Sequence, residues 1–446
     1  MRIAWCTPFS PTSAIGRVSE IVVEELARVP GVTVDVWHPR GVGGRVWSGT
    51  ARPLEAVDLD VLRGYDHVVY HLGNHAPNHR SLWQASLEVP GLVVMHDVVM
   101  TSLFHDQLLE LGLYPEELGR WYGDAVAGLA ERVLAGSPET PPWSVELGPS
   151  FPMISTAAMG AQVVVVHSQF AHRATAGVVL ADVVELGLPV LETAAPATTR
   201  AQLGLPVDRP LVLQAGLFHA NKRIDLVIEA FADVVRQRDA HLVIAGRPAG
   251  LSVDDVRAAL RRHELEGAAT VFDDPSDGTL AALRQQADVA IALRDPCLEG
   301  ASYSLLESLA SGLPVVTVSD GSYAEVQGPF VRHVPRPLRA QDVAAATVAL
   351  LDADRDAVAA AARDYVERRH HPGVYARRLL EVLDQSCGAA PRNGLVEALA
   401  DALAGTGLAG TDEFVVRVAE RAEELFGRRP AAWPPRAEIT HEPAAR

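Results

Sequence analysis

The chain has 446 residues, of which 48% are apolar and 21% are charged, and its formal net charge is −17 at pH 7. This length allows two or three domains with a hydrophobic core each, and the composition is typical of a globular enzyme. The acidic excess argues against non-specific binding to nucleic acid or to an anionic membrane, because both require clustered cations.

The three cysteines, Cys6, Cys297 and Cys387, lie far apart in the sequence. They fit neither a disulfide framework nor a thiolate metal site, and we therefore expect a reducing, cytoplasmic environment. The N-terminal residues enter an apolar strand directly and lack the pattern of a signal peptide. No apolar run approaches the length that spans a bilayer, so we expect no integral membrane segment.

Short apolar runs alternate with longer helical patterns, in two series. The first series predicts a helix at residues 17–29 and strands at 2–6, 32–37, 67–73, 91–97 and 162–168. The second predicts helices at residues 223–238 and 254–265 and strands at 210–216, 241–246, 269–273, 288–293 and 314–319. This alternation indicates parallel sheets with helices on both faces, and the continuous Val, Ile and Leu runs are typical of strands buried on both sides.

A stretch rich in Pro, Ala and Thr at residues 185–210 separates the two series. We therefore predict an α/β fold with two doubly wound domains, residues 1–195 and 196–385, followed by a C-terminal extension at 386–446. Such sheets bind ligands outside the carboxyl ends of their strands, so we expect the site in the cleft between the domains. The extension has amphipathic helical patterns and a polar tail, and we expect it to pack without taking part in the chemistry.

The stretch CLEGASYSLLESLASGLPVV, residues 297–316, places Glu299 in a loop and Glu307 in the helix that follows. This helix is expected to start at Ser302 or Ser304, and its N-terminus offers free N–H groups to an anion. Two alternatives remain open. Glu307 also fits a capping box with Ser304, and Glu299 also fits an exposed acid of a loop.

Cations accompany these two acids. Lys222 and Arg223 follow a strand that ends in a glycine, and Arg294 lies five residues before Glu299. Cations at this edge would neutralise a diphosphate, an arginine through bidentate contacts, although lone surface cations are common. Together with a helix N-terminus and two acids, they describe a nucleotide-sugar site, with phosphates on one side and sugar hydroxyls on the other.

These features resemble the GT-B glycosyltransferases, specifically the retaining family four group, over residues 1–385. The resemblance rests on Glu299 and Glu307 in an E-x7-E spacing before SLASGLPVV, and on the segments GLFHANKRIDLVIEAFADV, VVMHD and VVVVHSQFA. It implies two Rossmann-like domains around a deep cleft, with extra C-terminal helices. The first domain would bind the acceptor, and the second would bind the nucleotide-sugar donor.

The resemblance also implies residue roles. Lys222 would stabilise the departing diphosphate, Glu299 would bind hydroxyls of the donor hexose, and His96 would lie near its anomeric centre. A histidine at a strand end is also a common structural hydrogen-bonding residue, so both readings of His96 stay open. The expected donor-binding residues are Gly16, Arg223, Arg294, Gly300, Ala301, Ser302, Tyr303, Ser304, Leu305 and Glu307.

Two positions depart from the family pattern. Leu217 stands five residues before Lys222, where the family usually has an arginine. We hypothesise that Arg294 replaces this cation, together with Arg223. The first loop, PTSAIGR, has one glycine, Gly16, where relatives often have two.

The resemblance implies a hexosyltransferase that moves a sugar from a nucleotide-diphosphate donor to a hydroxyl of a soluble acceptor, with retention at the anomeric carbon. Because no D-x-D motif stands at a strand end with a partner, we expect no essential metal, and no cofactor besides the donor substrate. Two alternatives are an epimerase or cyclitol-coupling enzyme on the same fold, and a non-catalytic GT-B protein that stabilises a partner enzyme.

Overall fold

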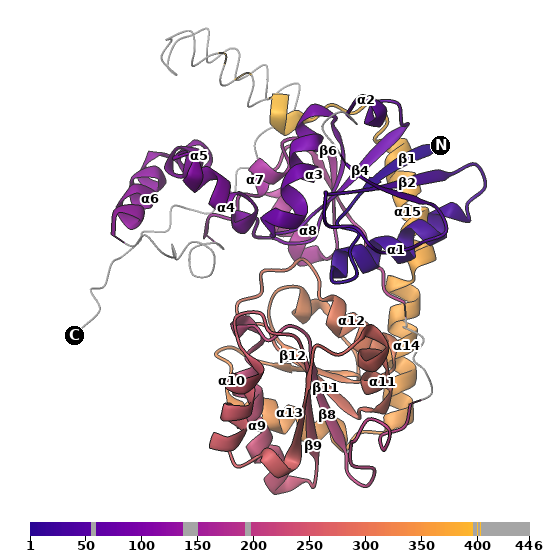
Figure 1. The fold of residues 1–446 in the computed structure, drawn as a ribbon, viewed down its shortest axis with the longest axis vertical. Coiled ribbons are helices and arrows are strands. Elements are labelled where there is room, and N and C mark those ends of the chain that lie inside the picture. The colour runs from indigo at the N-terminus through magenta and orange to yellow at the C-terminus, as the bar shows by residue number, and fades with distance from the viewer. Residues whose placement is uncertain (55–58, 137–149, 192–197, 396–398, 400–401, 403–446) are drawn as a thin grey trace.

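The computed structural model describes residues 1–54, 59–136, 150–191, 198–395, 399 and 402. Two lobes are each built on one parallel sheet flanked by helices (Figure 1). Every strand that the sequence predicts is present, and the predicted α/β fold is confirmed.

The N-terminal sheet has the order β3-β2-β1-β4-β5-β6-β7. Its strands are β1 (Arg2–Cys6), β2 (Thr33–His38), β3 (Thr50–Pro53), β4 (His67–Leu72), β5 (Gly91–Met95), β6 (Ala161–Val166) and β7 (Asp182–Glu185). The helices of this lobe are α1 (Ala14–Ala27), α2 (Leu59–Leu62), α3 (Ala76–Glu88), α4 (Thr101–Glu110), α5 (Tyr114–Tyr122), α6 (Asp124–Gly136), α7 (Ile154–Ala157) and α8 (Gln169–Ala176). The strand order reverses between β1 and β4, which is where doubly wound sheets bind ligands.

The C-terminal sheet has the order β10-β9-β8-β11-β12-β13 and reverses between β8 and β11. Its strands are β8 (Leu211–Ala215), β9 (His241–Gly246), β10 (Ala269–Asp273), β11 (Val289–Ala292), β12 (Val315–Val318) and β13 (Val331–Val334). Its α-helices are α9 (Ile224–Gln237), α10 (Val253–Arg262), α11 (Asp277–Gln286), α12 (Tyr303–Ala310) and α13 (Ala340–Leu351). Short 3-10 helices are η4 (Ala220–Lys222), η5 (Glu266–Ala268) and η6 (Gly321–Glu325).

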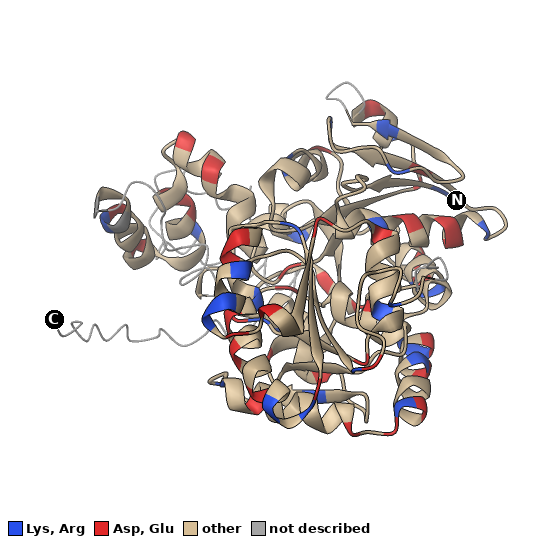
Figure 2. Cartoon of the chain, turned by 60° about the horizontal axis from the view of Figure 1, so that its bottom comes forward, with Lys and Arg blue, Asp and Glu red and all other residues tan. Residues whose placement is uncertain are grey.

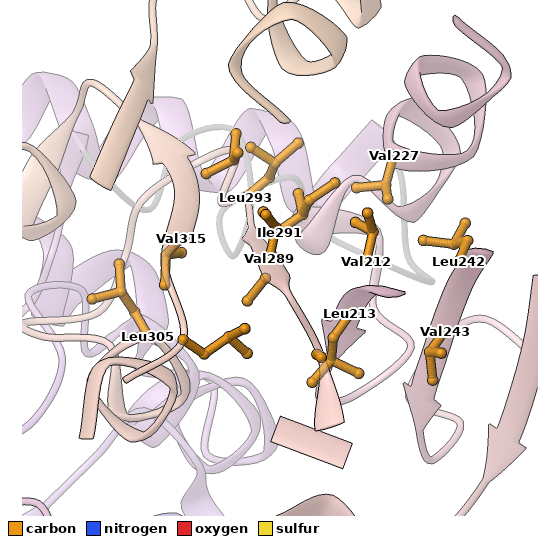
Figure 3. Close-up of a cluster of buried hydrophobic side chains, with 14 of the residues drawn as sticks. Val212, Leu213, Val227, Leu242, Val243, Val289, Ile291, Leu293, Leu305 and Val315 are labelled. Atoms are coloured by element: carbon orange, nitrogen blue, oxygen red, sulfur yellow. The ribbon is translucent and has the colours of Figure 1, made fainter. Parts of the chain in front are cut away.

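Buried aliphatic side chains fix α12 to the C-terminal sheet. Leu305 of α12 belongs to one cluster with Val289 and Ile291 of β11 and Leu213 of β8, and each is at most 2% exposed (Figure 3). Burial of one such side chain stabilises the fold by about 1.5–3 kcal/mol. The first turn of α12 is therefore held in a defined position at the carboxyl edge of the sheet.

The chain returns to the N-terminal lobe through its last two helices, α14 (Arg355–His370) and α15 (Pro372–Gln385). Tyr375 and Leu379 of α15 pack in the same buried cluster as Ile3 and Val22 of the N-terminal lobe. The sequence-predicted second domain, residues 196–385, therefore extends in space over both lobes.

Part of the predicted C-terminal extension also contacts the N-terminal lobe. The Asn393 side chain is buried, and its Oδ1 accepts a hydrogen bond from the Leu180 amide at 2.6 Å. The helices predicted further along the extension lie outside the described residues, apart from residues 399 and 402. Acidic and basic residues are both spread over the helices (Figure 2). No described helix has the length and apolar character needed to cross a bilayer.

Candidate functional site

A cleft of about 430 Å³ lies between the two lobes, at the carboxyl ends of both sheets. The N-terminal lobe contributes the loop at residues 11–15, together with Arg17 and His96. The C-terminal lobe contributes segments that follow β8, β9, β10 and β11, and the start of α12. Both points of strand-order reversal thus face one cavity, which is the position predicted for the site.

The N-terminus of α12 opens toward this cleft. Ser302 is the N-cap, because its Oγ accepts a hydrogen bond from the Leu305 amide at 3.4 Å. The capping box with Ser304 as the cap is therefore wrong. The predicted donor-binding residues Ala301, Ser302, Tyr303 and Ser304 do line the cleft. Leu305 does not, since its amide serves the cap and its side chain is buried in the core.

The loop before α12 is bonded to the N-terminal lobe. The Gly300 amide donates to the backbone oxygen of His96 at 2.8 Å. The Gly300 carbonyl accepts from Oγ of Ser168 at 2.6 Å. Both backbone polar groups of Gly300 are therefore in use, and this glycine positions the neighbouring Glu299 rather than offering a free N–H group to a ligand.

Glu299 reaches the cleft with its carboxylate held on both sides. Arg294 Nε lies 3.2 Å from Oε1 and Nη2 donates to Oε2 at 3.3 Å. The Tyr323 hydroxyl also donates to Oε1. Glu299 is 24% exposed and its partner Arg294 is 13% exposed, so the carboxylate is oriented yet still open to a ligand hydroxyl.

Lys222 ends η4 and is buried beside the same pair. Its Nζ donates to the backbone oxygen of Ala215 at 3.4 Å. Burial and, to a lesser extent, the nearby Arg294 lower the pKa of Lys222 to about 7, against an opposing effect of Glu299. A Cβ at Gly216, which has φ +124°, would lie 2.0 Å from Nζ. A glycine is therefore required at this strand end for the lysine to reach the cleft.

Arg223 does not take part in the cleft, contrary to the prediction. It adopts the left-handed conformation with φ 49° at the start of α9. Its guanidinium pairs with Asp225 at 3.2 Å and with Asp295 at 3.0 Å. The turn after η4 therefore directs the Arg223 side chain away from Lys222. Leu217, the position where the family usually has an arginine, does line the cleft and is 41% exposed.

Gly16 supports the cleft without lining it. It lies in the first turn of α1, and a Cβ there would approach the backbone oxygen of Pro8 to 2.5 Å. Its amide donates to Oγ of Ser13, the N-cap of the helix, at 3.0 Å. The glycine thus allows α1 to pack closely on the preceding loop, which places Arg17 over the cleft.

Glu307 is paired with two arginines. Arg17 Nη1 donates to Oε1 at 2.8 Å from the N-terminal lobe, and Arg284 Nη2 donates to Oε2 at 2.5 Å from α11. Arg17 also pairs with Asp277. Glu307 and Arg284 are each 5% exposed. This group is a buried charge network that joins the lobes at one end of the cleft.

His96 and Asp97 follow β5 on the opposite side. His96 is 8% exposed, and its Nε2 lies 2.9 Å from Nδ1 of His71 on β4. Burial lowers the pKa of His96 well below its usual range. Burial raises the pKa of Asp97 to about 7, although Oδ2 accepts a hydrogen bond from the Asn74 amide at 2.7 Å.

The sequence did not identify several residues of this site: Arg17, His71, Asp97, Arg284 and Tyr323. Arg17 and Asp97 had a local signal, because each directly follows a predicted site residue. The other three carry no motif, since they reach the site only through the packing of separate elements. Among the described residues, no group of three or more His, Cys, Asp or Glu side chains is placed to hold a metal ion.

The family model of glycosyl transferases group 1 matches residues 195–369. No curated protein matches the chain. Sucrose-phosphate synthase from Thermosynechococcus elongatus is similar in structure, with a TM-score of 0.58 and 16% identity over 87% of this chain and 100% of that chain. A glycosyltransferase from Rickettsia africae has a TM-score of 0.60 and 14% identity over 87% of this chain and 99% of that chain.

HepE from Anabaena, in a complex with UDP and glucose, has a TM-score of 0.56 and 15% identity over 86% of this chain and 100% of that chain. At these identities the structural likeness shows the fold alone. The sequence match covers the lobe that carries Lys222, Glu299 and Glu307.

Proposed function

We propose that this chain, whose C-terminal domain is a glycosyl transferases group 1 domain and whose two lobes have the GT-B fold, is a retaining glycosyltransferase. It moves a hexose from a nucleotide-diphosphate donor to a hydroxyl of a soluble acceptor. The observation that carries this proposal is the convergence of Lys222, Glu299 and the α12 N-terminus with His96 of the other lobe around one cleft.

The chemistry requires charge stabilisation at the leaving diphosphate. Negative charge grows there as the anomeric C–O bond breaks, and preorganised positive groups at that position are the largest source of catalysis. Lys222 and the first turn of α12 supply such groups. We extend this proposal to Arg294, which lies beside Lys222 and replaces the cation missing at Leu217. HepE, which shares the fold, binds UDP, so UDP is the first donor base to test.

The sugar lies on the other side of the α12 N-terminus in this proposal. Glu299 accepts hydrogen bonds from its hydroxyls, because Arg294 and Tyr323 hold the carboxylate in one orientation. Glu307 accepts from the ribose. Attack takes place on the face that the diphosphate leaves, and the departing phosphate accepts the proton of the acceptor hydroxyl. No protein nucleophile is then needed, and we propose that no essential metal takes part.

The acceptor would bind on the N-terminal lobe, near His96 and Asp97. The Gly300 amide bonds to the backbone oxygen of His96 between the two lobes, and enclosure of the reacting atoms between the lobes would exclude water from them.

The three cysteines are free, which is consistent with a reducing compartment, and we propose a cytoplasmic location.

Thermal unfolding with UDP, GDP, dTDP and ADP is the first test. A ligand at a hundred times its Kd stabilises the protein by about 2.7 kcal/mol, which corresponds to a shift of about 2–4 °C or more in Tm. One nucleotide is expected to stand out. If none shifts Tm while the protein is folded, the non-catalytic GT-B alternative, which the uncharged Leu217 favours, replaces this proposal.

Turnover of the matching nucleotide sugars then separates the reaction types. The anomeric coupling constant of the product in proton NMR distinguishes retention from inversion, and a changed hexose without an acceptor identifies an epimerase. Lys222→Met and Glu299→Gln are expected to lower kcat by about 100-fold or more. Arg236→Gln, at an exposed pair on α9, is the matched control and is expected to retain activity.

A further inference from the structure

Four buried histidines lie together behind the cleft in the N-terminal lobe. His71 is 0% exposed, His79 2%, His167 3% and His96 8%. The rings of His71 and His96 are stacked with centroids 5.2 Å apart, and those of His96 and His167 are 4.8 Å apart. Among them, His96 lines the cleft.

In His79 and His167, the outer two of the four histidines, a hydrogen bond to a backbone carbonyl determines which ring nitrogen carries the proton. His79 Nδ1 lies 2.9 Å from the backbone oxygen of His71, and His167 Nδ1 lies 3.0 Å from that of Leu186. A carbonyl only accepts, so both rings carry their proton on Nδ1. Burial lowers the pKa of His79 and of His167 to about 4, which keeps both neutral near pH 7.

The inner pair, His71 and His96, shares one bridging proton. Burial lowers the pKa of both rings well below the usual range, so both are neutral at neutral pH. Nδ1 of His71 and Nε2 of His96 are 2.9 Å apart, and one of the two must donate. The direction of this bond decides which nitrogen of His96 carries a proton, and therefore what the ring offers to the cleft.

The second nitrogen of His71 settles the direction. His71 Nε2 is buried and has no hydrogen-bond partner among the described residues, and the same is true of Nε1 of Trp5, whose ring centroid lies 4.5 Å away. If His96 donated, His71 would carry its proton on Nε2, and a second buried N–H without an acceptor would lie beside the indole N–H. Orphaned buried N–H groups are rare, and each costs free energy.

We propose that His71 fixes the tautomer of His96, by donating from Nδ1 to Nε2 so that the proton of His96 is held on Nδ1. His71 is thus a positioning residue for His96. Nδ1 of His96 has no partner among the described residues, and it is the nitrogen left to meet a ligand. His96 therefore presents an N–H donor to the cleft instead of a basic lone pair.

This inference rests on the proposed function for its consequence, although the tautomer itself does not. A donor tautomer binds an oxygen of the sugar or of the departing group, whereas it cannot remove the proton of the acceptor. This role of His96 agrees with a reaction in which the leaving phosphate accepts the proton of the acceptor hydroxyl.

NMR of the full chain with ¹⁵N-labelled histidine rings tests the tautomer directly, because protonated and bare ring nitrogens have distinct ¹⁵N shifts. Spectra of His96→Asn and His71→Asn assign the two rings. We expect His96 with a protonated Nδ1 and a bare Nε2, and His71 with a protonated Nδ1. A proton on Nε2 of His96 overturns the proposal, whether or not the protein transfers sugar.

Two variants of His71 test its role. His71→Asn keeps an N–H donor at the place of Nδ1, whereas His71→Leu removes it. We expect His71→Leu to lose the fixed Nδ1–H tautomer and to lower kcat by about 100-fold, as for loss of one preorganised donor, while His71→Asn retains both. If His71→Leu is folded by its thermal unfolding curve and His96 keeps its tautomer, the positioning role is wrong. Should no nucleotide sugar be turned over, the proposed function fails, and the spectra of the two variants still decide the inference.

Discussion

Arg17 of α1 and Glu307 of α12 form an ion pair across the cleft, with Nη1 2.8 Å from Oε1. The pair joins the two lobes, and Arg284 occupies the second carboxylate oxygen. A carboxylate has about four acceptor sites, so Glu307 still has capacity for the ribose hydroxyls that we expect it to bind. The ion pair and the ribose site are thus compatible on one side chain.

Arg17→Gln is expected to loosen the contact between the lobes. It removes a charged hydrogen bond to a buried carboxylate, which contributes about 1.5–3 kcal/mol, as well as the pair with Asp277. We expect a lower Tm and a larger radius of gyration in small-angle scattering of the nucleotide-free protein. Arg28→Gln is the control, because Arg28 is 67% exposed in its pair with Glu25. An unchanged Tm and radius for Arg17→Gln would show that this pair does not hold the lobes together.

Lys222→Met is expected to stabilise the protein while it lowers kcat. The folded-state pKa is about 7 against a usual 10.5, so the unfolded chain binds more protons between these values and stability rises with pH across this window. Burial of the lysine therefore costs most below pH 7, by about 5 kcal/mol for the difference between 10.5 and about 7 at 1.36 kcal/mol per pKa unit. The gain in Tm from Lys222→Met should be large at pH 6.5 and should shrink toward pH 10. A gain that does not depend on pH contradicts a lowered lysine pKa.

The lowered pKa of Lys222 also leads us to expect that the protein takes up a proton when a nucleotide binds. At pH 8 the buried amine is mostly neutral, and a diphosphate beside it favours the charged form. Calorimetry of UDP binding in buffers with different ionisation enthalpies should show uptake of about one proton at pH 8. Binding to Lys222→Met should show none. Equal enthalpies in all buffers for the unsubstituted chain would place the diphosphate away from Lys222.

The strands were predictable because most are buried on both sides and read as continuous apolar runs. The sequence missed β3, β7 and β13, all three of which are edge strands, and every residue of β3 is exposed. Such strands lack the burial that produces an apolar run. Their positions follow from the pairing of the sheet and not from their own residues.

The site was predictable where residues follow strand ends, because parallel strands bring their carboxyl ends to one edge. Lys222, Glu299 and His96 meet the cleft for this reason. Arg223 leaves it because one left-handed residue turns the side chain away. Arg17 and Arg284 lie 290 and 23 residues from Glu307, and no local pattern indicates such pairs.

Asp97→Asn is expected to remove a pH dependence of stability whose sign is opposite to that expected from Lys222. Burial raises the pKa of Asp97 from 3.8 to about 7, so the folded state binds more protons between these values and stability falls as pH rises through this window. Relative to the unsubstituted chain, Asp97→Asn should gain Tm between pH 5 and pH 8. Asparagine keeps an oxygen for the Asn74 amide, which bonds to the present carboxylate at 2.7 Å. A difference in Tm that is constant from pH 4 to pH 8 would show that Asp97 is ionised throughout.

Leu217→Arg tests whether the cleft lacks a diphosphate cation. Leu217 is 41% exposed and lines the cleft, so an arginine fits there without loss of core packing. At this exposure a new ion pair contributes up to about 1 kcal/mol, or about fivefold tighter binding of the nucleoside diphosphate that stabilises the protein. Val207→Arg, at a site that is 69% exposed and outside this cleft, controls for the added charge.

Arg294→Met completes this comparison. If Arg294 replaces the missing cation, its loss should weaken nucleotide binding by about tenfold or more, since a charged hydrogen bond contributes about 1.5–3 kcal/mol. Leu217→Arg should then restore part of that affinity in the double variant. Equal affinities for Arg294→Met and the unsubstituted chain, measured by calorimetry, would assign Arg294 to the orientation of Glu299 alone, because the two side chains pair at 3.2 Å.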